Sequence, residues 1–574
     1  MKLDFSNAFN LIRRDAVLAA IATSLPSIYK FCCLSYQNTS YLQYDEHIIS
    51  SQEGVQQSDP LGPLLFCLTV HPLLSSLTCK LVVGYMDDFS LGGPTADILT
   101  DLALISSQQS SLGLRLNPIK CEIISDSKSS HPAQLDNFIT VQPSHATLLG
   151  VPLSTEEALE AMLASVLADL ERSVDRLSNL TSHDALLLKN CLGGPKLLHI
   201  LRTAPCCNHP FLTQFDNLLR SALSHICNLT FTDDQWKQAS LPVRNGGLGV
   251  RSVAQLASSA FLASAASTLP LQSRILRNFH LDAEDNFPSV NTWKSLSNCS
   301  SFDDVPTMSQ KALDTMVANN AFNELLSQQT DPYHQARLLA ASAAHSGDWI
   351  HALPITACGL RLNDEEVRIA AGMRLGVELC QPHQCPCGAM VDARATHAFA
   401  CKRNPGRSQR HHFINDLIYR AMSRAQIPST KEPHGLSRTD GKRPDGMSLI
   451  PWRDGRCVTW DVTIIDTTAQ SYLTSTARCA ASAAELAAKR KESKYAVISS
   501  THHFCPIALE TMGPINSLGT EFISELGRRI SRITDDARET AFFFQRLSVA
   551  VQRFNSVCFI SSFSSTGDKF LPPR

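Results

Sequence analysis

The stretch Leu81-Val-Val-Gly-Tyr-Met-Asp-Asp-Phe-Ser-Leu91 determines the fold expected for the N-terminal part of this chain. Residues 81–85 and 89–91 are β-type runs, and Met86, Asp87 and Asp88 separate them, which is the pattern of a hairpin. Two adjacent carboxylates at the tip of an apolar hairpin are costly to desolvate unless a cation compensates their charge. The alternative is an ordinary solvated turn. The stretch therefore predicts a hairpin that presents paired carboxylates.

A third aspartate, Asp4, lies in another strand-like run, Lys2-Leu-Asp-Phe5, which a helical segment follows. Nucleotidyl transfer needs carboxylates that hold two divalent metal ions roughly 3.5 to 4 Å apart, one at the attacking hydroxyl and one at the leaving pyrophosphate. Mg²⁺ suits such oxygen ligands, and Mn²⁺ is the other candidate ion. Asp4, Asp87 and Asp88 are therefore candidate metal ligands.

Five segments, in this order, resemble the motifs of the reverse transcriptases of non-LTR retrotransposons. They are Leu3-Asp-Phe-Ser-Asn-Ala-Phe9, Gly54-Val-Gln-Gln-Ser-Asp-Pro-Leu-Gly-Pro-Leu-Leu-Phe66, Tyr85-Met-Asp-Asp88, Leu112-Gly-Leu-Arg-Leu-Asn-Pro-Ile-Lys120 and Leu148-Leu-Gly-Val-Pro152. The resemblance implies a polymerase palm in which the three aspartates bind the metals. It also implies template RNA and deoxynucleoside triphosphates as substrates.

The same resemblance assigns roles to further residues. Phe9 would screen the sugar 2′-hydroxyl, and Lys120 would protonate the leaving pyrophosphate. The nucleotide and template would contact Phe5, Gln56, Gln57 and Tyr85. Two alternatives stay open: Lys120 is equally explained as a solvated lysine at a strand edge, and the glutamines as buried residues that backbone groups satisfy.

Two departures from the family pattern concern polymerisation. Ser58 stands where the family usually has glycine, so a side chain is added where the backbone passes close to the nucleotide. The chain also begins three residues before Asp4, which predicts a palm without fingers, from an incomplete gene model or a degenerate element.

Cys385, Cys387, His397 and Cys401 have the spacing C-x-C-x9-H-x3-C, and these soft ligands suit tetrahedral Zn²⁺ in a structural site. Coincidence in a cysteine-rich chain is the rival explanation, and Cys380 and His383 are close enough in sequence to serve as alternative ligands. The dense basic stretch that follows is predicted to grip nucleic-acid phosphate, or to be a solvated helix start. Its candidate residues are Lys402, Arg403, Arg407 and Arg410, followed by His411 and His412.

A second carboxylate pair follows the cysteine cluster. Arg443-Pro-Asp-Gly446 precedes a strand-like run, Val458-Thr-Trp-Asp-Val-Thr-Ile464, so Asp445 and Asp461 could share one metal ion that activates water. This order resembles the restriction-like endonucleases of site-specific non-LTR retrotransposons. Thr463 stands where that core often has lysine, so Lys491 or Lys494 is expected to supply the cation from the next helix.

The length and composition of the chain limit its possible domain organisation. A chain of 574 residues exceeds what one hydrophobic core supports, so several domains are expected. Net charge is −2, so any phosphate-binding surface must be local. The most apolar stretch, 63–74, is too short to span a bilayer, which predicts no membrane segment. Dispersed cysteines without a secretion signal favour a reducing compartment, here the nucleus and cytoplasm.

The predicted fold class is α+β. Residues 1–155 would form a reverse-transcriptase palm, 156–384 a helical thumb and connector, 385–412 a zinc knuckle with its basic stretch, and 413–574 an α/β restriction-like endonuclease. Within the connector, the glycines of Leu241-Pro-Val-Arg-Asn-Gly-Gly-Leu-Gly-Val250 mark a tight connection, and the polar segment 286–308 is predicted to be a linker.

The predicted function is target-primed reverse transcription, in which the nuclease nicks target DNA and the exposed 3′-hydroxyl primes copying of template RNA. One alternative is a polymerase-dead remnant that binds nucleic acid. Another is an endonuclease that uses the palm as a scaffold. The pattern does not determine the target site or the oligomeric state.

Overall fold

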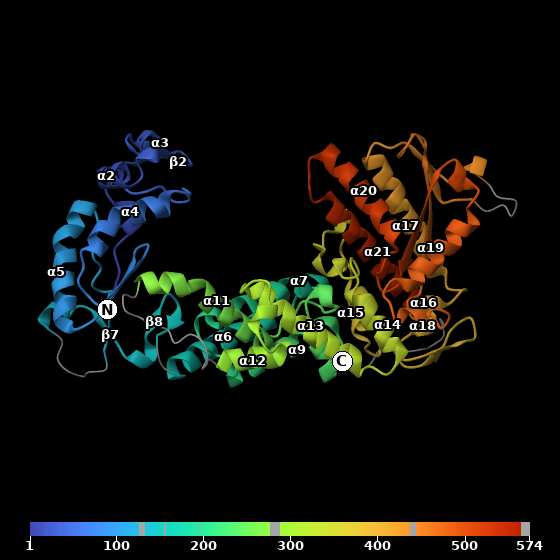
Figure 1. Ribbon diagram of the computed structural model, residues 1–574, viewed down its shortest axis with the longest axis horizontal. Coiled ribbons are helices and arrows are strands. Elements are labelled where there is room, and N and C mark those ends of the chain that lie inside the picture. The colour runs from blue at the N-terminus through green and yellow to red at the C-terminus, as the bar shows by residue number, and fades with distance from the viewer. Residues whose placement is uncertain (126–131, 154–155, 193, 276–287, 437–442, 564–574) are drawn as a thin grey trace. The chain divides into compact units, whose positions relative to one another are not determined.

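The computed structural model describes residues 1–125, 132–153, 156–192, 194–275, 288–436 and 443–563 (Figure 1). It divides into two compact units, one formed by residues 1–162 and 267–283, and the other by 163–266 and 284–574. In the described part of the chain, no helix is both long and apolar enough to cross a membrane.

The first unit is built around a five-stranded sheet with the strand order β4-β5-β1-β6-β7. Its strands are β1 (Lys2–Leu3), β4 (Leu81–Tyr85), β5 (Asp88–Gly92), β6 (Glu122–Ile124) and β7 (Ile139–Val141). The predicted hairpin is confirmed, because β4 pairs antiparallel with β5 and Tyr85 lies opposite Asp88. Strand β1 then pairs with β5, with Leu3 opposite Phe89.

Helices pack on this sheet and bury one apolar core. The helices are α1 (Ala8–Leu11), α2 (Arg14–Ser24), α3 (Pro26–Tyr36), α4 (Gly62–Ser75) and α5 (Thr95–Leu112). Phe5, Phe66 and Phe89 lie in the core between them. Two small hairpins complete the unit: β2 (Ser40–Tyr44) with β3 (His47–Ser51), and β8 (Thr147–Leu148) with β9 (Val151–Pro152).

The second unit begins with helices. They are α6 (Glu156–Leu177, which starts in the first unit), α7 (Ser182–Leu192), α8 (Gly194–Thr203), α9 (Pro210–Cys227), α10 (Asp233–Ala239), α11 (Val253–Ile275), α12 (Pro288–Ser297), α13 (Gln310–Gln328), α14 (Pro332–Ser342) and α15 (Asp364–Leu375). This helical character agrees with the 3.6-residue periodicity of the segment.

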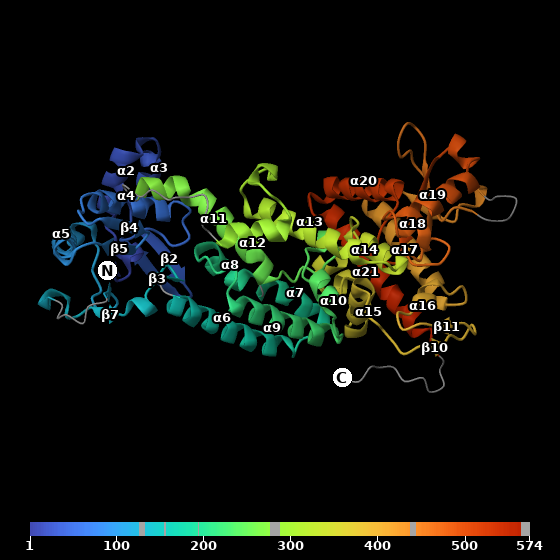
Figure 2. The same cartoon turned by 60° about the horizontal axis from the view of Figure 1, so that its bottom comes forward.

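The predicted linker at 286–308 is wrong for its described part, while residues 286 and 287 lie outside the described residues. Helix α12 occupies the segment and lies beside α13 (Figure 2). Trp293 is fully buried against Leu313 and Val317, and its Nε1 donates to the Leu313 carbonyl at 3.2 Å. Although most residues of this segment are polar, its apolar residues lie on one face of the helix. Burial of that face holds the segment in the core.

The rest of the second unit is a four-stranded sheet of order β12-β13-β14-β15 with helices around it. Its elements are β10 (His383–Gln384), β11 (Met390–Val391), α16 (Thr396–Ala400), α17 (Pro405–Arg424), β12 (Ser429–Lys431), β13 (Gly446–Ser448), β14 (Val458–Ile465), α18 (Leu473–Thr476), α19 (Ser482–Lys494), β15 (His503–Glu510), α20 (Ser517–Thr534) and α21 (Glu539–Ile560). Strands β12, β13 and β14 pair antiparallel, whereas β14 and β15 are parallel and joined through α19. The predicted regions 156–384, 385–412 and 413–574 therefore pack mainly within one unit.

Candidate active sites and metal centre

The first site is the tip of the β4–β5 hairpin. Leu3 lies opposite Phe89, and continuing that antiparallel register places Asp4 opposite Asp88. Burial raises the pKa of Asp88, and the negative charges of Asp87 and Asp4 raise it further. The three carboxylates therefore repel one another at close range. Such a group of acids suits divalent metal ions, because cations relieve the repulsion.

Asn117 orients the first of these acids. Its Nδ2 donates to Asp4 Oδ2 at 3.2 Å, and its backbone N–H donates to the Asp4 carbonyl at 2.9 Å. The Asp4 N–H in turn faces the buried sulfur of Cys121 at 3.4 Å. Sequence reasoning placed Asn117 inside a motif but gave it no role. Its signal was the family spacing between this asparagine and Lys120.

The second site is the predicted zinc cluster. The ligand atoms of Cys385, Cys387, His397 and Cys401 all lie within 4.8 Å of one another. Cys387 Sγ is 3.1 Å from His397 Nε2, and Cys385 Sγ is 3.9 Å from Cys401 Sγ. The β10–β11 hairpin supplies the first two ligands and α16 with its C-terminal boundary supplies the others. Three sulfurs and one imidazole at this separation fit a tetrahedral Zn²⁺ ion.

The two alternative zinc ligands lie outside this cluster. His383 Nε2 is 3.0 Å from Ser562 Oγ, and the Cys380 sulfhydryl donates to the Asp392 carbonyl. Within the cluster, backbone and side-chain hydrogen bonds lower the pKa of the Cys387 thiol, whereas burial raises the pKa of Cys385. Cys385 is buried and Cys387 is half-buried, and a bound cation would favour the thiolate form of both.

The third site lies on the C-terminal sheet, where β13 and β14 bring the second carboxylate pair together. Gly446 lies opposite Trp460, so the same register places Asp445 opposite Asp461. Asp445 Oδ2 accepts the Val462 N–H at 2.6 Å and lies 3.1 Å from His411 Nε2. Asp461 is only 3% exposed, and burial together with the charge of Asp445 raises its pKa.

Helix α19 supplies the cation of this site. Lys491 Nζ forms an ion pair with Asp461 Oδ1, and this contact lowers the pKa that burial raises. Lys494 instead donates to the Tyr495 hydroxyl at 2.9 Å, and that hydroxyl donates to the Arg443 carbonyl at 3.0 Å. Of the two lysines predicted for this role, Lys491 is the one that contacts the carboxylate.

Two contributors to the third site were missed as site residues. In the sequence His411 belongs to a basic stretch, whereas in the structure it contacts Asp445, and this hydrogen bond raises the pKa of its imidazole. Tyr495 follows the two lysines in the sequence, and its hydroxyl helps to lower the pKa of Asp461. No local pattern encodes either contact, because both partners come from distant elements.

Comparison with known proteins identifies the N-terminal part of the chain. Residues 1–153 match the family model of reverse transcriptase (RNA-dependent DNA polymerase). This part of the chain is therefore similar to a reverse-transcriptase domain. Over 560 residues the chain is 23% identical to the retrotransposable element SLACS 132 kDa protein of Trypanosoma brucei gambiense, which covers 93% of this chain. The match spans 42% of that protein, less than half of its length. Together these matches support the resemblance to non-LTR retrotransposon reverse transcriptases.

In the reverse-transcriptase domain, the predicted nucleotide and template residues divide into two groups. Phe5 is buried, edge-to-face with Phe89 at 5.0 Å between ring centroids, so the expectation that it contacts a nucleotide is wrong. Successive strand residues face opposite sides of a sheet, so Phe5 faces the core whereas its neighbour Asp4 faces the other side. Phe9 is half-buried and stacks on Phe66 at 4.4 Å. Tyr85 is 55% exposed.

The remaining predicted residues of the reverse-transcriptase domain are open to solvent. Gln56 Nε2 donates to Ser40 Oγ at 3.3 Å, and Gln57 Nε2 donates to Asn10 Oδ1 at 3.4 Å. Both glutamines are exposed, so the buried-glutamine alternative is wrong. Lys120 is exposed just before β6. These side chains are therefore accessible to a nucleotide or template.

In the basic stretch, one of the predicted phosphate-binding residues, Arg410, is buried. Lys402 and Arg403 are exposed, and Arg407 is half-buried with Nη1 on the Ala400 carbonyl at 3.2 Å. Arg410 is 1% exposed, and its Nη1 donates to Asn555 Oδ1 of α21 at 2.6 Å. The prediction that Arg410 grips phosphate is wrong, because its position on α17 faces the protein interior.

Proposed function

We propose that this chain is an RNA-directed DNA polymerase of a non-LTR retrotransposon, with template RNA and deoxynucleoside triphosphates as substrates. The observation that carries the proposal is the register that sets Asp4 opposite Asp88, beside Asp87, within a reverse-transcriptase domain. These carboxylates would hold Mg²⁺ or Mn²⁺. Bound divalent ions supply Lewis-acid stabilisation of the attacking hydroxyl and of the leaving pyrophosphate.

Three residues of the chain would orient the metal ligand, limit space at the sugar and transfer a proton. Asn117 holds Asp4 in place through its amide, so the carboxylate is oriented before substrate arrives. The half-buried ring of Phe9 would limit space at the sugar. Lys120 is exposed and can deliver a proton to the pyrophosphate oxygen as it leaves.

Primer extension on an RNA template tests this proposal. Asp87→Ala removes a metal ligand at the hairpin tip, and we expect extension to fall by about 10³-fold, which corresponds to roughly 4 kcal/mol of lost transition-state stabilisation. Asp45→Asn is the control, because Asp45 is also a hairpin aspartate of this unit but is exposed away from the sheet. A chain that binds template yet never extends a primer would be a polymerase-dead remnant.

We propose a second activity, DNA endonuclease, because the third site combines two facing carboxylates with a lysine. Asp445 and Asp461 would hold Mg²⁺, which when bound supplies water activation. Val462 and His411 fix the Asp445 carboxylate, and Lys491 can stabilise charge that develops on a phosphate. The nicked target DNA in the nucleus would then offer its 3′-hydroxyl to the polymerase, as in target-primed reverse transcription.

Nicking of supercoiled plasmid tests the endonuclease. We expect Asp445→Ala to reduce nicking by about 10²- to 10³-fold, equivalent to roughly 3 to 4 kcal/mol. Asp454→Asn is the control, because Asp454 lies in the same unit with a side chain that is 65% exposed. Nicking that survives in Asp445→Ala would remove this assignment without affecting the polymerase. Nicking without any primer extension would leave the palm as a scaffold.

We also propose that the four-ligand cluster holds one Zn²⁺ as a structural ion beside Lys402 and Arg403. Metal analysis of the purified chain is expected to give one zinc per chain, and Cys401→Ser should lose it with a lower melting temperature. Cys479→Ser is the matched control, because Cys479 is an exposed free cysteine. Equal zinc content in both variants would refute the site.

A further inference from the structure

Three exposed basic side chains lie along the helical part of the second unit. They are Arg202 on α8, Arg244 in the short helix η3 (Val243–Asn245), and Lys311 on α13. We call them the connector strip. None of the three belongs to the carboxylate sites or to the zinc cluster.

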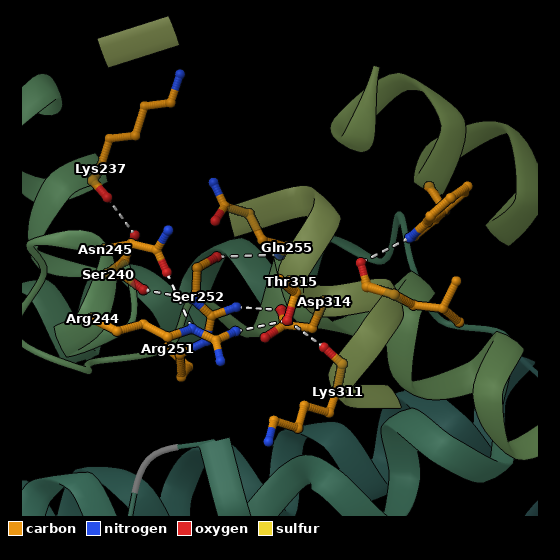
Figure 3. A network of polar contacts seen from close by, with 12 residues as sticks. Lys237, Ser240, Arg244, Asn245, Arg251, Ser252, Gln255, Lys311, Asp314 and Thr315 are labelled. Atoms are coloured by element: carbon orange, nitrogen blue, oxygen red, sulfur yellow. Dashed lines mark hydrogen bonds and ion pairs between the residues drawn. The ribbon is translucent and has the colours of Figure 1, made fainter. Parts of the chain in front are cut away.

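Hydrogen bonds join these residues into one continuous surface. Arg202 donates from Nε and Nη2 to Gln310 Oε1 at 2.9 and 2.7 Å, and Gln310 directly precedes Lys311. One turn further along α13, the Thr315 hydroxyl donates to the Lys311 carbonyl at 2.6 Å. Arg244 Nη2 lies 2.6 Å from the same hydroxyl (Figure 3).

The strip keeps its positive charge because its partners are neutral. Arg244 and Arg202 contact hydroxyl and amide oxygens, and in the described residues neither they nor Lys311 form an ion pair. Asp314, three residues after Lys311 on α13, forms an ion pair with Arg251, and the side chains of that pair are only 17% and 19% exposed. The guanidinium groups are thus oriented in advance without being neutralised.

The glycine-rich segment makes the Arg244 end of the strip rigid. A Cβ on Gly247 would lie 2.0 Å from the Leu241 carbonyl oxygen, so the chain can follow this path only with glycine there. Asn245 Nδ2 donates to Asn319 Oδ1 of α13 at 3.0 Å. These contacts fix η3 against α13 and hold Arg244 beside Lys311.

We propose that the connector strip contacts the phosphate backbone of a double-helical nucleic acid without reading its sequence. Lysine and arginine supply sequence-independent phosphate contacts, and the bound strand releases its counterions. On the described residues of α8, η3 and α13, no Phe, Tyr or Trp ring is exposed on which single-stranded bases could stack. The choice of ligand rests on the proposed function, because a primed template and a target site are both duplexes.

Salt-dependent binding of the full chain tests the strip. Fluorescence anisotropy would follow a 30-base-pair RNA–DNA hybrid and a DNA duplex of the same length, in an Asp87→Ala, Asp445→Ala background that removes both proposed activities. We expect Arg202→Gln, Arg244→Gln, Lys311→Gln to make the slope of log K against log salt shallower by about three on DNA. If the triple variant loses more affinity for the hybrid, the strip binds the primed template. If it loses more affinity for the DNA duplex, the strip binds the target.

Two matched variants separate phosphate contact from other effects. Lys237→Gln also removes one positive charge, but Lys237 pairs with Glu324 at 2.7 Å and points away from the strip in Figure 3, so binding should be nearly unchanged. Arg244→Lys, which keeps the charge, should retain most of the affinity. Unchanged slopes in the triple variant, or an equal loss in Lys237→Gln, would overturn the proposal. Because binding is measured without catalysis, an inactive polymerase would leave this result intact.

Discussion

The two carboxylate sites differ in how the repulsion between their carboxylates is compensated. At the β4–β5 hairpin, burial and the charges of Asp87 and Asp4 raise the pKa of Asp88, and Lys2, which pairs with Glu122, offsets only part of this effect. On the C-terminal sheet, Asp461 is almost fully buried but is matched by Lys491. The first site therefore depends on added cations, whereas the second carries part of its own compensation.

This difference predicts that the two sites respond differently to metal binding and to substitution. The three acids of the hairpin form no ion pair among the described residues, so their repulsion is strongest when no metal is bound, and metal binding should strongly affect this site. A carboxylate that already has an ion-pair partner is stable without metal, but the lysine is then part of its structural support. Substitutions in each site should consequently change stability to different extents.

The largest expected effect is on the ion pair of the C-terminal site. Lys491→Met should lower the unfolding free energy of this unit by about 3 kcal/mol, because it leaves Asp461 buried without its cation. Asp88→Asn should leave stability unchanged or slightly higher, since it removes repulsion. Denaturant unfolding of the full chain measures both.

Lys489→Met controls for the loss of a lysine from the same helix, because Lys489 is exposed. A double-mutant cycle with Asp461→Asn isolates the pair. If Lys491→Met lowers the unfolding free energy equally in the Asp461→Asn background, the ion pair does not cause the loss of stability. The contrast between the two sites would then be wrong.

Glu510, on β15 of the same sheet, is a buried acid that has no ion-pair partner in the part of the chain that the structure describes. Glu510 accepts the Ala484 N–H at 3.1 Å, its second oxygen has no partner among the described residues, and burial raises its pKa to about 6. A raised carboxyl pKa makes the folded state bind the proton more tightly, so this contribution to stability is lost as pH rises from about 4.5 to 6.

Glu510→Gln should therefore be more stable than the unsubstituted chain at pH 7 by about 2 kcal/mol, and this advantage should vanish near pH 4.5. Urea unfolding at several pH values measures the difference. Glu521→Gln is the control, because Glu521 is exposed. A pH-independent difference would show that ionisation of Glu510 is not responsible.

The smallest expected effect concerns the backbone of the first unit. Ser58 has φ of 69°, in the left-handed region that favours glycine. Ser58→Gly should stabilise the reverse-transcriptase domain by about 0.5 kcal/mol, because strain relief exceeds the added entropy of the unfolded chain. Primer extension should rise about twofold at fixed template. Ser58→Ala keeps the Cβ and should gain neither, so equal gains in both variants would exclude backbone strain as the cause.

Sequence reasoning succeeded where the signal was local. The β4–β5 hairpin follows from two apolar runs around a turn, and the spacing of Cys385, Cys387, His397 and Cys401 was enough to predict that their ligand atoms meet. It failed where composition and packing disagree. The polar segment around Trp293 forms a core helix, and Arg410 lies inside a run of charges yet is buried against α21.

The sequence by itself determined which chemical groups this protein carries and on which strands they lie, because alternation and turn residues act over a few positions. Only the tertiary structure decided which groups meet. Asp4 reaches Asp88 through strand pairing, Lys491 rather than Lys494 reaches Asp461 through the packing of α19, and His411 reaches Asp445 from α17. The physical reason is that ion pairs and burial act through space, so their partners are set by how distant elements pack.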